Sequence, residues 1–321
     1  MIKTLKLNTI VAESQLGQRL DQALAKLFPD YSRSCIKKWI LADQVIVNGK
    51  KINKPRNKVL GNEFISINAQ MKEDNPWIPQ AIFLDIVYED NDILVINKPR
   101  SLIVHPGAGN IDGTILNALI HFYPAIINVP RAGIVHRLDK NTTGLMVVAK
   151  TIPAHTYLVQ ALQKHKIIRE YEAIVIGNII SGGIVEKPIT RHPVKRTHMI
   201  VHLTGKPAIT HYRVIEHFRA YTHLQLCLKT GRTHQIRVHM SHIQHSLVGD
   251  PMYSGQLSYP KDTSDILINK LRNFNRQALH ATMLRLLHPI SRIPMEWHAA
   301  LPEDMATLIT LLQADKKNIS K

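Results

Sequence analysis

The sequence has few cysteines and few acidic residues, and it has no long apolar run. Only Cys35 and Cys227 are present, far apart along the chain, so no disulfide framework is encoded and a reducing compartment is expected. The first residues lack the apolar core of a signal peptide. Apolar stretches such as Leu145–Ala149 fall far short of the roughly 18 residues that a membrane helix requires. We therefore expect a cytoplasmic protein without a membrane partner.

Acidic side chains are scarce relative to basic ones. The 24 Asp and Glu face 41 Lys and Arg, which gives a formal net charge of +17. So large an excess indicates a polyanionic partner, because neutralised phosphates release counterions and raise affinity. Hydrophobic residues make up 45%, enough to fill a core and too many for a disordered chain. Composition therefore favours a folded nucleic-acid-binding protein over the alternative, a soluble protein that is merely basic.

Signatures of nucleotide, serine-hydrolase and metal chemistry are also missing. The stretch HPGAGN at 105–110 contains Gly-x-Gly, but no third glycine follows at the spacing of a dinucleotide fingerprint. No P-loop, GxSxG elbow, HExxH or paired CxxC occurs. Ten histidines between Lys187 and Gly249 are interleaved with ten Lys or Arg, whose charge repels a metal. Phosphate or base contact is the better interpretation of these histidines, and we expect neither a cofactor nor a metal.

Residues 1–75 have the pattern of a small separate module. Apolar residues at i, i+4, i+8 and i+11 predict one helix, and they are Leu16, Leu20, Leu24 and Leu27. Ser32 is a candidate N-cap for a second helix that contains Trp39. Val45–Val47 then meets Asn48-Gly49, a dipeptide suited to the positive φ angles of a tight hairpin turn.

The order helix, helix, hairpin resembles the S4-like RNA-binding module, and the matching stretches are RLDQAL, SRSCIKKWI and VIVNGKKI. The resemblance implies that basic residues of this module contact RNA, and the candidates are Arg19, Arg33, Lys37 and Lys38. A solvated charged face explains half of the module's cations equally well. The polar segment 68–80 carries two prolines and is the expected linker, so the predicted domains are 1–75 and 76–321.

Residues 76–321 combine short apolar stretches with helical patterns. Strands are predicted at 93–97, 144–149, 171–176 and 224–229. Helices are predicted at 115–122, at 155–165 and after Pro302, with a frayed polar tail at 314–321. Because strands do not alternate regularly with long helices, we expect an α+β fold with a mixed, mostly antiparallel sheet and peripheral helices. No heptad pattern or apolar patch favours a dimer, so a monomer is expected.

The segment 134–150, IVHRLDKNTTGLMVVAK, is the most specific in the chain. Asp139 on its own has the character of a turn residue that bonds to following backbone amides. The whole motif, however, closely resembles the active-site motif of the RluA/RluD family of ribosomal RNA pseudouridine synthases. REYEAIVIG at 169–177 and LKTGRTHQIRVHM at 228–240 resemble the tyrosine-bearing and arginine-bearing motifs of that family. RHPVKRTHMIVH at 191–202 is similar to its RluD branch.

The resemblance extends over nearly the whole chain. Further stretches occur in the order that the family has, namely VYEDNDILVINKP, LVGDPMYSG and QALHATMLRLLHP. The chain departs from the family at Arg100-Ser101, where a small residue followed by glycine is usual. That departure affects one turn and leaves the three catalytic motifs unchanged.

The family resemblance implies an isomerase that breaks the glycosidic bond of a uridine, turns the base and rejoins it through carbon. It assigns Asp139 as the essential carboxylate, Arg237 as the cation that keeps it ionised, and Tyr171 as the ring that stacks on the flipped uracil and helps remove its carbon-5 proton. If the segment around Arg237 is helical, Ile236 and Met240 face the core and Arg237 lies at its boundary. Asp139 either attacks the base or ribose covalently or removes a ribose proton, and both routes stay open.

The same resemblance implies the RNA contacts. Arg137 is the candidate to fill the space left by the flipped nucleotide, and His136 and Arg232 are candidates for phosphate contacts. Within the RluD branch, the expected substrate is the uridine cluster of the helix 69 stem-loop in 23S ribosomal RNA, as RNA or in a pre-large-subunit particle. Two alternatives remain. A non-catalytic assembly protein explains the charge but not the joint occurrence of HRLD, REYEA and HQIRVH. A metal-dependent nuclease needs several clustered carboxylates, whereas these motifs offer mainly Asp139.

Overall fold

The computed structural model forms two compact units, Met1–Pro76 and Trp77–Lys321, and we describe each by itself. It describes all residues except 1, 30, 32, 73–76, 108 and 318–321. The boundary at Pro76 falls inside the segment expected to be a linker. Among the helices of the described residues, none is long and apolar enough to cross a membrane.

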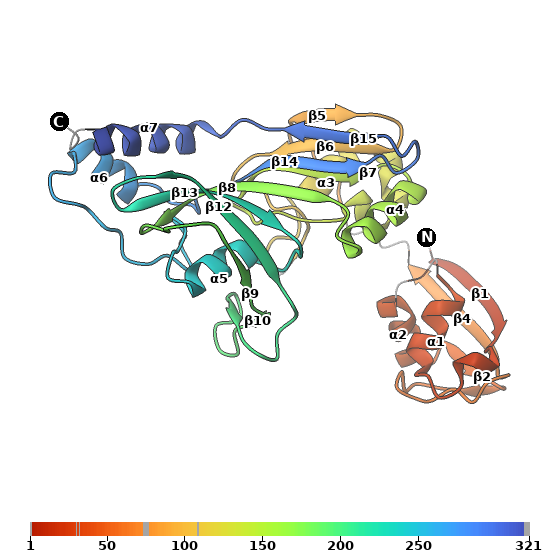
Figure 1. Ribbon diagram of the computed structural model, residues 1–321. Coiled ribbons are helices and arrows are strands. Elements are labelled where there is room, and N and C mark those ends of the chain that lie inside the picture. The colour runs from red at the N-terminus through yellow and green to blue at the C-terminus, as the bar shows by residue number, and fades with distance from the viewer. Residues whose placement is uncertain (1, 30, 32, 73–76, 108, 318–321) are drawn as a thin grey trace. The chain divides into compact units, whose positions relative to one another are not determined.

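The first unit packs two helices against a small antiparallel sheet with the strand order β1–β4–β2–β3 (Figure 1). Its elements are β1 (Ile2–Ile10), the 3-10 helix η1 (Glu13–Gln15), α1 (Leu20–Leu27), α2 (Arg33–Leu41), β2 (Val45–Val47), β3 (Lys50–Lys51) and β4 (Phe64–Lys72). Asn48 and Gly49 join β2 to β3 with φ angles of 46° and 80°, so the predicted hairpin turn is confirmed. Leu24, Ile36 and Ile40 are fully buried between the helices and the sheet.

Two local predictions for this unit are wrong. Leu16 does not belong to the first helix: it is 63% exposed, and α1 begins only at Leu20 because Arg19 has an extended backbone. Residues 68–72 are not linker but the end of β4, where pairing with β1 satisfies their backbone polar groups. The predicted N-cap Ser32 lies outside the described residues.

The second unit is built on a nine-stranded sheet with the order β5–β6–β7–β14–β8–β13–β12–β9, and β15 pairs with β14. Its strands are β5 (Ile86–Glu89), β6 (Ile93–Lys98), β7 (Thr143–Ala149), β8 (Ile168–Ile176), β9 (Gly183–Glu186), β12 (Ile209–His217), β13 (Tyr221–Leu228), β14 (Leu279–Leu287) and β15 (Pro294–His298), with β10 (Ile189–Arg191) and β11 (Met199–Val201) as a separate hairpin. Its helices are α3 (Ile115–Phe122), η2 (Pro124–Asn128), η3 (Pro130–Gly133), α4 (Ile152–Gln163), α5 (Gln235–His242), α6 (Asp265–Arg272) and α7 (Glu303–Lys317).

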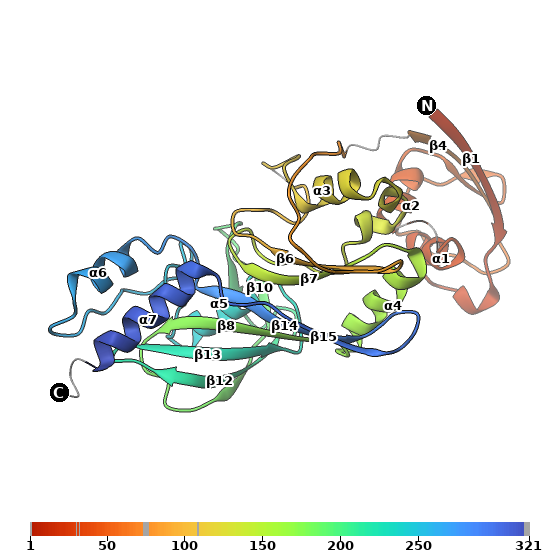
Figure 2. The same ribbon diagram turned by 90° about the horizontal axis from the view of Figure 1, so that it is seen from above.

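The sheet is mixed and mostly antiparallel, which confirms the predicted α+β class. Only β7 and β14 run parallel among the paired strands described here. Helices α3 and α4 cover opposite faces at β6 and β7 (Figure 2). Because side chains alternate along a strand, Met146 and Val148 pack with α3, while Leu145 and Val147 pack with α4. All of β7 is therefore buried.

The predicted strands and helices of this unit all occur. α3 matches the range 115–122, whereas α4 spans Ile152–Gln163 instead of the predicted 155–165. The prediction of a frayed tail at 314–321 is partly wrong, because α7 continues to Lys317. Asp315 in its last turn is 7% exposed and accepts hydrogen bonds from Arg219, which fixes the helix end. Residues 318–321 lie outside the described part.

The parallel pair β7–β14 brings two distant segments into close contact. Thr143 pairs with His280, and Gly144 pairs with Ala281. Gly144 has a φ of 112°, and a Cβ built on it would lie 2.3 Å from the carbonyl oxygen of Ala281. Only glycine fits this contact, which sets the start of β7 and the loop before it.

We expect Gly144→Ala to lower the free energy of unfolding of the second unit by about 2–5 kcal/mol, because overpacking adds to backbone strain. Urea denaturation followed by circular dichroism measures this change. Gly107→Ala is the matched control, since no atom lies within 4 Å of a Cβ at that position and its φ is not positive. Equal stability of the two variants would contradict the packing argument.

Candidate active site

Asp139 lies in the loop between η3 and β7, and its carboxylate pairs with a guanidinium from α5. Arg237 donates a hydrogen bond from NH1 to Oδ2 of Asp139 at 3.0 Å. The side chain of Asp139 is 17% exposed and that of Arg237 is 4% exposed. As the sequence predicted, Ile236 and Met240 are buried. Arg237, which was expected at the boundary of the core, is buried as well, and its guanidinium extends to Asp139. The carboxylate is thus open to a ligand while its cation is held by the protein.

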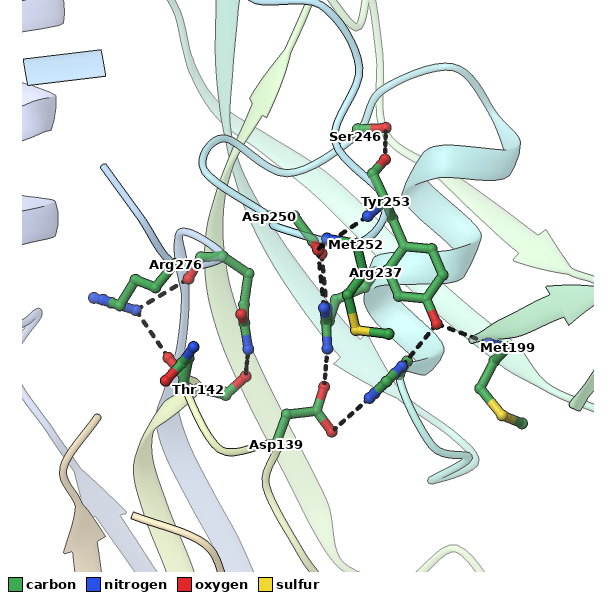
Figure 3. Close-up of polar contacts among 12 residues, drawn as sticks. Asp139, Thr142, Met199, Arg237, Ser246, Asp250, Met252, Tyr253 and Arg276 are labelled. Atoms are coloured by element: carbon green, nitrogen blue, oxygen red, sulfur yellow. Dashed lines mark hydrogen bonds and ion pairs between the residues drawn. The ribbon is translucent and has the colours of Figure 1, made fainter. Parts of the chain in front are cut away.

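A second carboxylate fixes the orientation of Arg237. Asp250 is fully buried and accepts hydrogen bonds from Nε (2.7 Å) and NH2 (2.8 Å) of that guanidinium (Figure 3). Backbone amides of Met252 and Tyr253 donate to Oδ1 of Asp250. Burial alone would lower the pKa of Arg237, but the hydrogen bonds and charges of Asp250 and Asp139 raise it above its usual value. The two-point contact with Asp250 leaves NH1 directed at Asp139.

An imidazole lies near the other oxygen of the Asp139 carboxylate. Nε2 of His234 is 3.9 Å from Oδ1 of Asp139, and its Nδ1 hydrogen-bonds to the hydroxyl of Tyr253 at 2.7 Å. The amide of Met199 in β11 donates to the same hydroxyl (Figure 3). Burial lowers the pKa of His234, and the opposing effect of the Asp139 charge, which raises it, is smaller. The ring is therefore predominantly neutral at pH 7. This chain of contacts connects the β10–β11 hairpin with Asp139.

A buried lysine anchors the loop that carries Asp139. Lys98 is 1% exposed, and its Nζ donates to the carbonyl oxygens of Pro99, Leu102 and Lys140 at 2.7–2.9 Å. Burial lowers its pKa to about 7, opposed by the charge of Asp139. Ser101, where the family usually has glycine, keeps a φ of 65° in the region that favours glycine. The turn around the ammonium therefore holds a non-glycine residue in a left-handed conformation.

Residues just before β14 hold the C-terminal end of the loop that carries Asp139. Gln277 donates to the hydroxyl of Thr142 at 2.9 Å. Arg276 donates to the carbonyl of Asn141 and forms an ion pair with Asp304 (Figure 3 shows Thr142 and Arg276). Since segments far apart in the sequence supply these contacts, the position of Asp139 depends on the tertiary fold.

A cleft of about 560 Å³ opens in front of Asp139. Four arginines line it, namely Arg131, Arg137, Arg169 and Arg232, together with Tyr171 of β8. Asp139 is the one carboxylate among the described residues that line it. Tyr171 is 4% exposed, and burial raises its pKa, so the phenol is neutral at pH 7. Asp139 and Tyr171 line this cleft, and both also line a smaller pocket together with Arg237, so the structure brings the three residues together as the motifs predicted.

The predicted RNA-contact residues of this unit differ in their surroundings. Arg137 and Arg232 are exposed at the cleft, and Nε of Arg232 donates to the carbonyl of Pro207. His136 accepts a hydrogen bond at Nε2 from the amide of Val147, and burial lowers its pKa to about 3. His136 therefore carries no charge at neutral pH, and any contact with phosphate uses a neutral N–H.

In the first unit, Arg19 and Arg33 both form ion pairs with Asp21, which is 2% exposed. Burial raises the pKa of Asp21, but its hydrogen bonds to the two arginines prevail and lower it below its usual value. Lys37 and Lys38 are exposed on α2 and form no ion pair with the described residues. RNA contact by all four residues stays a prediction.

Sequence reasoning did not identify Lys98, Asp250, His234 or Tyr253 as parts of the site. Each lies inside a stretch that carries the family resemblance, namely NKP, GDPMY or RTHQIR. Membership of these stretches was the sequence signal that could have identified the four residues. Their roles depend on partners that the sequence does not pair, such as Asp250 with Arg237.

Among the described residues, Asp90, Asp92 and His288 form one cluster whose ligand atoms are close enough together to hold a metal ion. The backbone amide of Ser291 donates to Nδ1 of His288, which places the ring proton on Nε2. Nε2 lies 3.0 Å from the carboxylate of Asp90. A protonated nitrogen offers no lone pair to a metal, so this cluster is an Asp–His contact.

Comparison with known proteins agrees with this site. Residues 92–242 match the RNA pseudouridylate synthase family, and residues 18–65 match the S4 domain. The chain belongs to the family of RNA pseudouridylate synthases, a class of isomerases. It is 70% identical to ribosomal large subunit pseudouridine synthase D of Yersinia pestis, covering 98% of this chain and 97% of that protein. The protein of the same description from Escherichia coli K12 is 64% identical, with the same coverage.

A solved structure supports the fold. Human RNA pseudouridylate synthase domain containing 4 superposes with a TM-score of 0.55 at 26% identity, covering 71% of this chain and 92% of that chain. The resemblance to the RluA/RluD family, its RluD branch and the S4-like module is therefore confirmed.

We expect Asp250→Asn to lower kcat about tenfold or more while the KM for RNA stays unchanged, because the guanidinium loses its two-point contact and no longer aims NH1 at Asp139. Asp315→Asn is the matched control, as it breaks another buried Asp–Arg pair, with Arg219, on α7. Steady-state kinetics on ribosomal RNA measure both constants. A loss of kcat of similar size in both variants would indicate general destabilisation instead.

Proposed function

We propose that this chain converts uridine to pseudouridine in 23S ribosomal RNA, with Asp139 as the catalytic carboxylate, and thereby supports maturation of the large subunit. The observation that carries the proposal is the pairing of Asp139 with Arg237 at a cationic cleft. Arg237 donates a hydrogen bond to one oxygen of this carboxylate and leaves the other available to act as a nucleophile or base. The names of the relatives at 64–70% identity, ribosomal large subunit pseudouridine synthases, support the choice of RNA.

The reaction breaks the N1–C1′ bond of uridine and forms a C5–C1′ bond after the base has turned. The proton of C5 leaves and N1 gains a proton, so the reaction balances without an oxidant or reductant. Asp139 acts as a nucleophile toward the base or ribose, or as the base that removes a ribose proton. Both routes use an unprotonated oxygen, and Arg237 occupies only Oδ2 by hydrogen bonding.

Tyr171 provides an aromatic surface beside Asp139. Its neutral phenol suits stacking on an uncharged uracil, and its position in the cleft suits assistance in removing the carbon-5 proton. The target nucleotide must first leave its stack, which costs roughly a few kcal/mol. Arg137, exposed at the cleft, is our candidate to fill the vacated space, and Arg232 and His136 are candidates for phosphate contacts.

The substrate that we propose is the uridine cluster of the helix 69 stem-loop, in RNA or in a pre-large-subunit particle. Lys37 and Lys38 of the first unit add affinity through phosphate contacts, because their charges are exposed and form no ion pair within the described chain. Arg19 and Arg33 form ion pairs with Asp21, and we propose that they contact RNA as well.

We expect Asp139→Ala to abolish tritium release from 23S ribosomal RNA labelled at carbon 5 of uridine, while RNA affinity stays near the wild-type value. Wild-type release should proceed without added nucleotide and in the presence of a chelator. Filter binding on the same RNA measures affinity. Release by the variant would refute the role of Asp139. RNA that binds wild-type protein without release would favour an assembly protein, and release that a chelator stops would favour metal chemistry.

We expect the double variant Lys37→Gln, Lys38→Gln to reduce the slope of log affinity against log salt by about 1.5, since each lost phosphate contact removes 0.7–0.9. The matched control is Lys316→Gln, Lys317→Gln, an exposed adjacent pair in the last turn of α7. Titrations of RNA at several salt concentrations give the slopes. An unchanged slope in the first variant would contradict phosphate contacts by α2.

A further inference from the structure

Arg169 on β8 is a buried cation for which the described protein offers no partner. It is 8% exposed, and its Nε is fully covered without a hydrogen-bond acceptor. Its guanidinium forms no hydrogen bond or ion pair with any described residue. The other two buried arginines differ, since Arg237 pairs with Asp250 and Asp139, and Arg276 pairs with Asp304.

An unpaired charge in this position is costly for the folded protein. Removing an ion from water costs several kcal/mol unless a counter-charge and hydrogen bonds replace the lost hydration. Arginines in protein interiors are accordingly paired, as Arg237 and Arg276 are here. A buried guanidinium without a protein partner therefore indicates that an anionic ligand completes it.

The guanidinium of Arg169 borders the catalytic cleft. Arg169 and Tyr171 are two positions apart on β8, so both side chains leave the same face of the strand, and both line the cleft with Asp139. On the opposite side the chain passes closely at Gly231, where a Cβ would lie 3.0 Å from NH1 of Arg169. Because Nε is covered, the terminal nitrogens are the atoms left to meet a ligand.

A second unsatisfied donor belongs to the same cleft. Nε2 of His136 accepts a hydrogen bond from the amide of Val147 at 3.0 Å, so the proton of the neutral ring is on Nδ1. That Nδ1 is covered and has no acceptor among the described residues. Burial, and then the charge of Arg169, lower the pKa of His136 to about 3. Because this Nδ1 is covered and the ring is neutral, the terminal nitrogens of Arg169 remain the donors of this pair that are open to a ligand.

We propose that the terminal guanidinium nitrogens of Arg169 form an anion-binding subsite that takes a phosphodiester group of the target nucleotide. This inference rests on the proposed function. Phosphates carry the formal negative charges of RNA, and the planar fork of a guanidinium matches two of their oxygens. Holding one backbone phosphate near Asp139 and Tyr171 sets the register of the flipped nucleotide, so Arg169 is a positioning residue.

Thermal stability separates this role from a structural one. Arg169→Met removes a buried unpaired charge while keeping the length of the side chain, so its Tm without RNA should equal or exceed the wild-type Tm. A lowered Tm would show that the guanidinium stabilises the fold and would overturn the proposal.

RNA binding tests the ligand itself. We would use the full chain and a substrate stem-loop in which each phosphate around the target uridine is replaced in turn by an uncharged methylphosphonate. For the wild type, one replacement should weaken binding by about tenfold to a hundredfold. Arg169→Met should weaken binding of the unmodified RNA by the same factor, and that one replacement should then have no further effect. Arg169→Lys should recover part of the affinity.

The control is Arg272→Met, which removes an exposed cation on α6 and should keep the wild-type pattern at every phosphate. If Arg169→Met also keeps the wild-type pattern, or loses sensitivity equally at all positions, the proposed subsite is wrong. Pseudouridine formation by the wild type on unmodified RNA is measured first. Its absence would overturn the proposed function, whereas product with an unchanged phosphate pattern overturns only the subsite.

Discussion

The guanidinium of Arg237, shared between Asp250 and Asp139, is the contact on which the rest of the site depends. Asp250 is fully buried and takes the two-point contact, so it determines where the third nitrogen points. Asp139 is partly exposed and receives that nitrogen, so it is oriented and remains accessible. Asp250 thus fixes the guanidinium from one side, and Asp139 receives its remaining nitrogen without being covered.

The fold serves to bring this arrangement together from distant segments. Asp139 precedes β7, Arg237 lies on α5 and Asp250 follows α5 in a turn. The parallel pairing of β7 with β14 and the hydrogen bond from Lys98 to the carbonyl of Lys140 both hold the segment that follows Asp139. Arg169 is the exception to this pattern, because it is a buried charge without a partner among the described residues. The ligand that we assign to it is the substrate backbone.

Apolar patterning along the chain predicted much of the secondary structure, as at α3, where every residue from Ile115 to Ile120 is buried. The tertiary fold overrode local pattern at Leu16 and at residues 68–72, where an extended Arg19 and pairing with β1 set the element boundaries. For the site, the motifs located Asp139, Arg237 and Tyr171. The partnership of Arg237 with Asp250 and the isolation of Arg169 follow from long-range contacts, which spacing along the chain does not encode.

A double-mutant cycle between Asp250→Asn and Arg237→Met tests this central contact most directly. The measurement is the single-turnover rate of pseudouridine formation by wild type, both single variants and the double variant. If Asp250 acts through Arg237, adding Asp250→Asn to Arg237→Met lowers the rate no further than Arg237→Met alone. If the two losses multiply instead, Asp250 acts on the reaction independently, and the shared guanidinium is not what organises the site.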